Sequence, residues 1–171
     1  MRTIHLLSFA AALILLSACG NTTRLNREQR QALKQNKYQA IASIIDSRSF
    51  TFHATAAAPM GGSNIQLTSR YYEVVFHGDS ISANLPYYGN SRESSYDSEG
   101  GIVFTRQPDQ YTVDKNDKRY RITIRFVIRE SSNRMEGTLS VSHDRYASLT
   151  MESSRRATVT YKGYIAERTE D

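Results

Sequence analysis

The chain has 171 residues, a formal net charge of +5 and 39% hydrophobic residues. The positive charge is small and dispersed, so it does not indicate a nucleic-acid-binding protein. The single cysteine, Cys19, excludes an intramolecular disulfide. Without residues 1–18, which have the pattern of a leader, about 150 residues remain, and this is enough for one domain with a buried core.

The N-terminus has the pattern of a secretory leader. Arg2 precedes an apolar run from Leu6 to Leu16. Because a run of about 11 residues is far shorter than the roughly 20 needed to span a bilayer, we interpret residues 1–18 as a signal peptide. The leader ends in Leu16-Ser17-Ala18-Cys19, which resembles the bacterial lipobox, where the cysteine is lipidated and becomes the mature N-terminus. The alternative is an ordinary secretory signal with an incidental cysteine.

Lipidation at Cys19 predicts how the protein meets a membrane. One acyl chain binds a bilayer only marginally, whereas two or more anchor a protein stably. We therefore expect a protein that is anchored to a membrane surface without spanning it. Residues 19–25 then form a short polar tether.

Residues 26–46 are predicted to form one amphipathic helix. Asn26 and Gln29 have the spacing of an N-terminal capping box. The apolar positions that recur at helical spacing are Leu33, Ala40, Ile41, Ile44 and Ile45. We favour packing of this stripe on a sheet, and the alternative is a helix that lies on the membrane surface.

From residue 47 to residue 168 the hydrophobic period is two, which predicts strands. Short strands with turn signals between them indicate an antiparallel meander of about eight strands, forming a barrel or strongly curved sheet. The N-terminal helix packs on this sheet, giving a single mainly β domain. In the first strand, Ala54, Ala56 and Ala58 are expected on one face, where small side chains allow either close docking of the helix or room for a ligand.

The clearest strand covers residues 119–130, with Ile122, Ile124, Phe126 and Ile128 on its apolar face. Its other face carries Arg119, Arg121, Arg125 and Arg129. Such a row of arginines could bind lipid phosphates or acidic glycans. We favour a structural interpretation, in which it is a solvated strand face paired with acids such as Glu136 on the next strand.

No catalytic, metal or cofactor site is predicted. His53, His77 and His143 do not lie at ligand spacing from one another. Asp109, Asp114 and Asp117 cluster in a way that could suggest a calcium site, but residues 114–118 are better explained as a polar hairpin turn. The sequence contains no nucleophile elbow and no phosphate-binding loop.

The stretch Leu85-Pro86-Tyr87-Tyr88-Gly89 leads into a long polar segment that contains Tyr96. Pro86 ends the preceding strand or places it at a sheet edge. Tyr87, Tyr88 and Tyr96 could stack on a sugar ring or line the mouth of a pocket. We favour a structural role for Tyr87, with its ring closing the core and its hydroxyl in water.

Six segments carry a resemblance to a known family: Leu67-Thr68-Ser69-x-Tyr71, Gly78-Asp79, Leu85-Pro86-Tyr87-Tyr88-Gly89, Gly100-Gly101-Ile102-x-Phe104, Tyr146-Ala147-Ser148-Leu149 and Tyr161-x-Gly163-Tyr164-Ile165. They resemble a Bacteroidota lipoprotein family catalogued as domain of unknown function 4251. The resemblance implies a mostly β domain in a Gram-negative cell envelope. It implies no catalytic residue, because the family has no established activity.

The sequence thus predicts a non-enzymatic envelope lipoprotein, on the outer membrane and facing the periplasm. We expect it to be a binding module for an apolar or glycan ligand or an envelope protein, without nucleic acid or a cofactor. The alternative is a structural or interaction lipoprotein with a filled core that acts through its outer surface.

Overall fold

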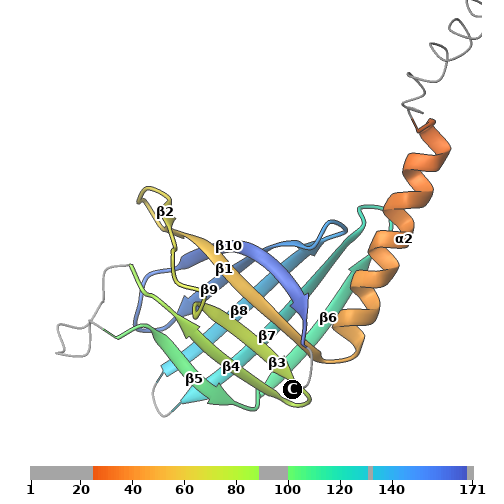
Figure 1. Ribbon diagram of the computed structural model, residues 1–171. Helices are drawn as coiled ribbons and strands as arrows, with labels where there is room; N and C mark the ends of the chain where they lie inside the picture. The colour runs from red at the N-terminus through yellow and green to blue at the C-terminus, as the bar shows by residue number, and fades with distance from the viewer. Residues whose placement is uncertain (1–24, 89–99, 131–132, 169–171) are drawn as a thin grey trace, which may run out of the picture. The chain divides into compact units, whose positions relative to one another are not determined.

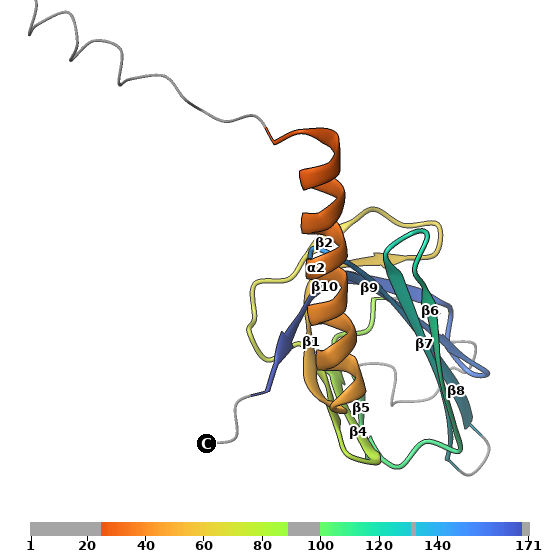
Figure 2. The same cartoon turned by 90° about the vertical axis from the view of Figure 1, so that its right-hand side faces the viewer.

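The computed structural model describes residues 25–88, 100–130 and 133–168. The chain divides into two compact units, residues 1–32 and 33–171, and the sheet lies in the second. In the described part of that unit, ten antiparallel strands form one sheet that curls into a half-barrel (Figures 1 and 2). The predicted mainly β fold with a strongly curved sheet is confirmed, with ten strands where about eight were expected.

The described residues contain one helix and ten strands. Their bounds are α2 Arg27–Asp46, β1 Ser49–Pro59, β2 Ile65–Gln66, β3 Glu73–His77, β4 Ser80–Leu85, β5 Ile102–Arg106, β6 Gln110–Asn116, β7 Arg121–Glu130, β8 Asn133–Ser142, β9 Tyr146–Ser153 and β10 Val159–Glu167. The strand order is β5-β4-β3-β1-β10-β9-β8-β7-β6, with β2 beside β1. The first long strand therefore pairs with the last, and β5 and β6 lie at the two ends of the strand order.

The inner face of the half-barrel is filled by large side chains. Alternate residues of the longer strands, such as β8 and β10, are buried on this face, and Phe52, Phe126 and Tyr161 are almost completely buried among them. Phe50 stacks on Phe76 with ring centroids 4.5 Å apart. Burial of this apolar surface stabilises the fold in place of a disulfide.

A β-bulge corrects the prediction for the first strand. The pairing of β1 with β10 shifts between Ala54 and Ala56, because the bulge inserts one extra residue in β1. The alternation therefore changes phase, and Ala57 joins the core in place of Ala56 and Ala58. Opposite the bulge, a Cβ on Gly163 would lie 1.8 Å from the carbonyl oxygen of His53, so only glycine permits this close approach.

Helix α2 begins with the predicted capping box. The Gln29 amide donates to Asn26 Oδ1 at 2.7 Å, and the Asn26 amide donates to Gln29 Oε1 at 3.0 Å. The buried residues of the helix are Tyr38, Ile41, Ala42, Ile44 and Ile45, and they share one core with the inward side chains of the strands. Leu33 was wrongly placed in this stripe and is 44% exposed, since the buried face begins only at Tyr38.

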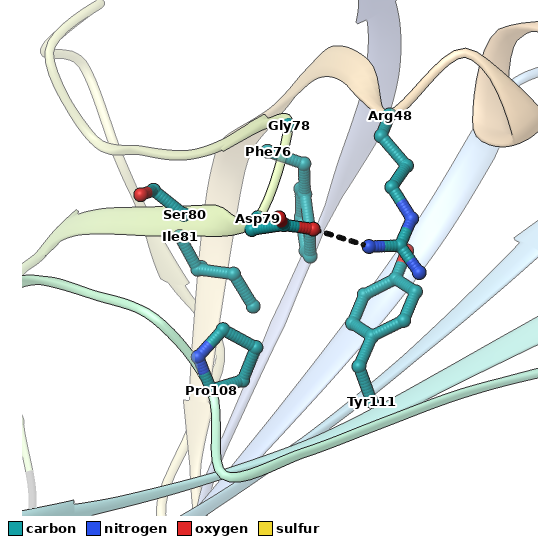
Figure 3. Close-up of a pocket in the computed structure, with 8 residues that line it drawn as sticks. All are labelled: Arg48, Phe76, Gly78, Asp79, Ser80, Ile81, Pro108 and Tyr111. Carbon is teal, nitrogen blue, oxygen red and sulfur yellow. Dashed lines mark hydrogen bonds and ion pairs between the residues drawn. The ribbon is translucent and has the colours of Figure 1, made fainter.

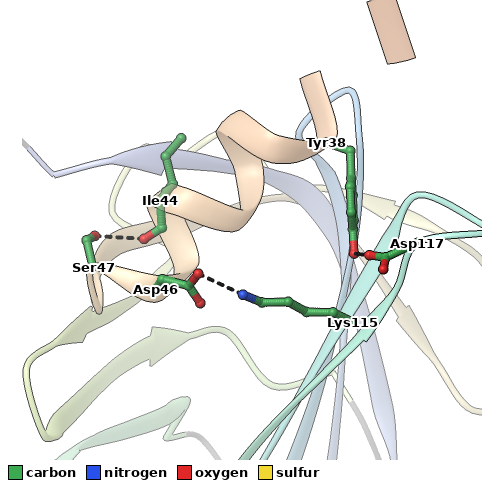
Figure 4. A network of polar contacts seen from close by, with 6 residues as sticks. All are labelled: Tyr38, Ile44, Asp46, Ser47, Lys115 and Asp117. Carbon is green, nitrogen blue, oxygen red and sulfur yellow. Dashed lines mark hydrogen bonds and ion pairs between the residues drawn. The ribbon is translucent and has the colours of Figure 1, made fainter. Parts of the chain in front are cut away.

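Two polar contacts fasten this helix to the β6 side of the sheet (Figure 4). The Tyr38 hydroxyl donates to Asp117 at 2.8 Å, and Lys115 Nζ lies 2.7 Å from Asp46. Burial and the hydrogen bond to the Asp117 carboxylate raise the pKa of Tyr38 to about 12. The predicted packing of the helix on the sheet is thus observed for its C-terminal part.

The turn before β7 lies further along the chain than predicted. Residues 117–120 form the turn, while Asp114 and Asn116 belong to β6. Tyr120 has a left-handed φ of 50°, which ends the regular alternation at that residue. The strand therefore begins at Arg121, and Arg119 lies in the turn instead of on the strand face.

Candidate functional site

A row of side chains crosses the outer face of the sheet from one strand to the next. Strand register pairs Tyr146 with Tyr164, Tyr164 with His53, and His53 with Glu73. The same register continues from Glu73 to Asn84 and from Asn84 to Val103. We call Tyr146, Tyr164, His53, Glu73, Asn84 and Val103 the outer row. It spans β9, β10, β1, β3, β4 and β5, which are successive neighbours in the sheet.

The aromatic part of the outer row is open to solvent. Tyr146 is 69% exposed and Tyr164 is 44% exposed. The rings of Tyr164 and His53 lie 5.2 Å apart between centroids, at an angle of 34°. Because outward residues on neighbouring antiparallel strands have Cβ atoms about 4.5–5.5 Å apart, the Tyr146 side chain begins directly beside that of Tyr164. Three aromatic side chains therefore lie in consecutive positions on the surface.

Polar groups with fixed positions follow these rings. Glu73 Oε2 lies 3.4 Å from His53 Nδ1. The side-chain amide of Asn84 donates to the Tyr71 backbone carbonyl at 3.0 Å. Beyond Tyr146, the Ser142 hydroxyl donates to the Tyr146 carbonyl at 2.8 Å, and Ser142 pairs with Arg121 of β7. The aromatic centre thus has hydrogen-bonding side chains on both sides.

Tyr87, a candidate contact residue in the sequence, differs from the outer row because its ring and its hydroxyl both contact the protein itself. The Tyr87 ring packs against the core, and its hydroxyl donates to the Ala157 carbonyl at 3.3 Å instead of pointing into water as predicted. Arg156 lies over this ring, 4.9 Å from its centroid, and it also donates to the carbonyls of Gly100 and Gly101. The buried Tyr161 hydroxyl donates to the Pro86 carbonyl at 2.8 Å. These bonds close one end of the core.

The remaining tyrosines of that stretch do not form a site with Tyr87. Tyr88 is 41% exposed, whereas Tyr87 packs against the core, as the alternation predicted. Tyr96 lies outside the described residues, as does Cys19. In the described part of the chain, these tyrosines therefore do not line a common pocket, because Tyr87 packs against the core and Tyr88 is exposed.

The arginine face is confirmed for three of its four residues. Arg121, Arg125 and Arg129 are exposed on the outer side of β7. Glu136, however, bridges Arg134 of its own strand at 3.0 Å and lies opposite Val127 in the register. Its expected pairing with the β7 arginines is therefore wrong, and Arg129 instead faces Arg134.

One hollow opens near the turn between α2 and β1 (Figure 3). Its lining residues are Arg48, Phe76, Gly78, Asp79, Ser80, Ile81, Pro108 and Tyr111. Arg48 bridges Asp79 at 2.9 Å and lies over the Tyr111 ring at 4.8 Å. The hollow has a volume of about 10 Å³, far below the roughly 300–1,000 Å³ of typical ligand pockets. It is too small for a lipid-sized ligand.

Burial leaves one polar group in this hollow without a partner among the described residues. The Tyr111 hydroxyl is buried and accepts or donates no hydrogen bond within that part of the chain. Its burial raises the pKa of Tyr111, while the nearby Arg48 guanidinium opposes the shift. Arg48 lies in the turn that follows helix α2, and its side chain contacts Asp79 in the β3–β4 turn and the Tyr111 ring in β6.

Neither a metal site nor a spanning helix is found where residues are described. Among residues 25–88, 100–130 and 133–168, no three His, Cys, Asp or Glu side chains are grouped so that they could hold a metal ion. Within the same ranges, no helix has both the length and the apolar character that crossing a bilayer requires.

Comparison with known proteins identifies the family. The family model described as Domain of unknown function (DUF4251) matches residues 32–165. The chain belongs to this family. A similar fold occurs in the crystal structure of a DUF4251 family protein from Bacteroides eggerthii, with a TM-score of 0.61 and 17% sequence identity. That match covers 80% of this chain and 91% of the other, and at this identity it shows the fold alone.

No functionally curated protein matches the chain. The DUF4251 assignment therefore supports the fold and the resemblance predicted from the sequence, while a function has to be argued from the residues themselves. The family match covers the strands that carry Tyr146, Tyr164, His53, Glu73 and Asn84.

Sequence reasoning missed the outer row. Tyr146 and Tyr164 were noted only as markers of the family resemblance, and His53 only as an isolated histidine. Their separation along the chain conceals their proximity, because β1 pairs with β10 across about a hundred residues of sequence. One sequence feature does indicate such a surface. Tyr146 and Tyr164 are both aromatic residues at outward positions of strands with alternating hydrophobicity.

Proposed function

We propose that this protein is a lipid-anchored, non-enzymatic binding module of the cell envelope that acts through the outer face of its sheet. The main support is the distribution of its aromatic side chains. Those on the inner face fill the core, whereas Tyr146, Tyr164 and His53 lie together on the outer face. Exposed aromatic clusters are typical of binding surfaces, since each ring offers a large contact area and loses little side-chain entropy on binding.

The packing of the described residues favours this version over an internal ligand site. Core side chains such as Phe52, Phe126 and Tyr161 occupy the inner face of the half-barrel. The hollow beside Arg48 leaves space for only about one water molecule. Of the two functions expected from the sequence, these observations support the one that acts through the outer surface.

The membrane anchor belongs to the proposal and rests on the sequence alone. Cys19 follows a leader and three residues that resemble a lipobox. Replacing Cys19 by Ala is expected to release the protein from the membrane fraction of the cells that produce it. A Cys19→Ala protein that still fractionates with membranes as the unaltered chain does would contradict the anchor.

The binding surface can be tested with the intact lipoprotein in detergent. Insoluble cell-wall fragments from a Bacteroides species serve as the probe, and sedimentation measures retention. We expect the unaltered protein to be retained and the double variant Tyr146→Ser/Tyr164→Ser to remain in solution. Tyr88→Ser is the matched control, because Tyr88 is an exposed tyrosine outside the outer row.

Two results would contradict an outer-face function. Equal retention of the double variant and the unaltered protein would show that the outer row is not the binding surface. Native mass spectrometry of the purified protein is a second check, in which we expect no co-purifying apolar ligand. A lipid bound in stoichiometric amount, in addition to the anchor, would contradict the proposal and indicate a ligand site inside the protein.

A further inference from the structure

The outer row has the form of an extended platform. From Tyr146 on β9 to Val103 on β5 it crosses five interstrand steps. At about 4.8 Å for each step, the row is about 24 Å long. It runs across the strands, so its side chains come from six segments of the chain but project from one surface. This shape fits an extended polymer better than a compact small molecule.

The row has an aromatic part and a polar part, which offer a ligand different contacts. The rings of Tyr146, Tyr164 and His53 present π faces, on which the C–H face of a sugar ring can pack. Glu73 and Asn84 follow with a carboxylate and an amide, which accept and donate hydrogen bonds to hydroxyl groups. Pyranose rings have both an apolar face and a hydroxyl edge, so they match this combination.

Other classes of partner fit the row less well. A lipid chain would need a continuous aliphatic surface, and Val103 is the single aliphatic member of the row. A polyanion would need clustered cations, but the row holds a carboxylate at Glu73 next to His53. The arginines of β7 form a separate group, of which only Arg121 aligns with the row through Ser142.

We propose that the outer row binds a linear, uncharged hexose polysaccharide, with successive sugar rings stacked along Tyr146, Tyr164 and His53. This inference rests on the proposed function and names the ligand class of the same surface. Glu73 and Asn84 bind the hydroxyl groups of the sugars that follow.

The test uses the intact lipoprotein in detergent and three hexasaccharides that differ in linkage or in sugar. Cellohexaose, maltohexaose and mannohexaose are titrated separately by isothermal calorimetry. We expect saturable binding of at least one. For that sugar, Tyr146→Ser/Tyr164→Ser should weaken binding by about tenfold or more, since it removes two stacking faces.

Matched variants separate stacking from a loss of folding. Tyr164→Phe keeps the ring and should retain affinity within about threefold, whereas Tyr164→Ser should not. Tyr88→Ser should bind as the unaltered protein does. Circular dichroism confirms that each variant remains folded, and a variant that unfolds is replaced by His53→Ala, which removes the third ring of the row.

The outcomes distinguish this inference from the proposed function. Absence of binding to all three hexasaccharides, or equal affinity of the double variant, overturns the inference. If wall fragments still retain the protein through Tyr146 and Tyr164 while no hexasaccharide binds, the outer face remains the binding surface and its ligand is not a hexose chain. If retention does not depend on these tyrosines, the proposed function itself fails.

Discussion

Tyr161 and Tyr164 lie three residues apart on β10 and occupy opposite faces of the sheet. Tyr161 is completely buried, and its hydroxyl donates to the Pro86 carbonyl. Tyr164 is 44% exposed and lies against His53. The same residue type therefore stabilises the fold on the inner face and remains available for contact on the outer face. An inventory of tyrosines cannot identify a site until their faces are known.

The largest loss of stability is expected from a substitution on the inner face of the sheet. Tyr161→Ala should lower the free energy of unfolding by about 3–5 kcal/mol, because it leaves a cavity and an unpaired Pro86 carbonyl. Tyr164→Ser is the control on the outer face and should cost about 1 kcal/mol or less. Urea unfolding followed by circular dichroism measures both. Equal losses would show that Tyr164 is as structural as Tyr161.

A second change disturbs both faces at once. Gly163 lies between the two tyrosines, where β10 passes close to the bulge in β1. Gly163→Ala should lower the free energy of unfolding by about 3 kcal/mol, since the new Cβ meets backbone instead of a movable side chain. The exposed neighbour Lys162 supplies a control, and Lys162→Ala should leave the unfolding midpoint nearly unchanged.

The smallest effect concerns a third tyrosine, which fastens α2 to the β6 side of the sheet. The pKa of Tyr38 is raised to about 12 from its usual 10.0, mainly by burial and then by the bond to Asp117. The neutral phenol is thus favoured in the folded chain, and its stabilising contribution is complete below pH 10 and is lost as the pH rises towards 12.

Tyr38→Phe should therefore make unfolding less steeply dependent on pH in that range, at a cost of about 1 kcal/mol at neutral pH. Some dependence should persist, because burial also raises the pKa values of Tyr111 and Tyr161. Thermal unfolding measured from pH 8 to pH 12 checks this expectation. An identical pH profile for the variant and the unaltered chain would contradict a stabilising Tyr38–Asp117 bond.

The sequence by itself determined the class of fold and much of its local structure. Period-two alternation identified the strands, because successive side chains of a strand point to opposite faces. Asn26 and Gln29 identified the start of the helix, since a capping box depends only on residues three positions apart. These features are local, so the order of residues is sufficient to predict them.

The tertiary structure decided which distant residues meet. The bulge that moves Ala57 into the core depends on the pairing of β1 with β10, and the outer row depends on the same pairing. The sequence favours a Tyr87 ring that closes the core with its hydroxyl in water, but the hydroxyl bonds to the Ala157 carbonyl, seventy residues away. Strand order and register bring such groups together. Neither can be predicted from the spacing of residues within one strand, because both depend on which strands pair.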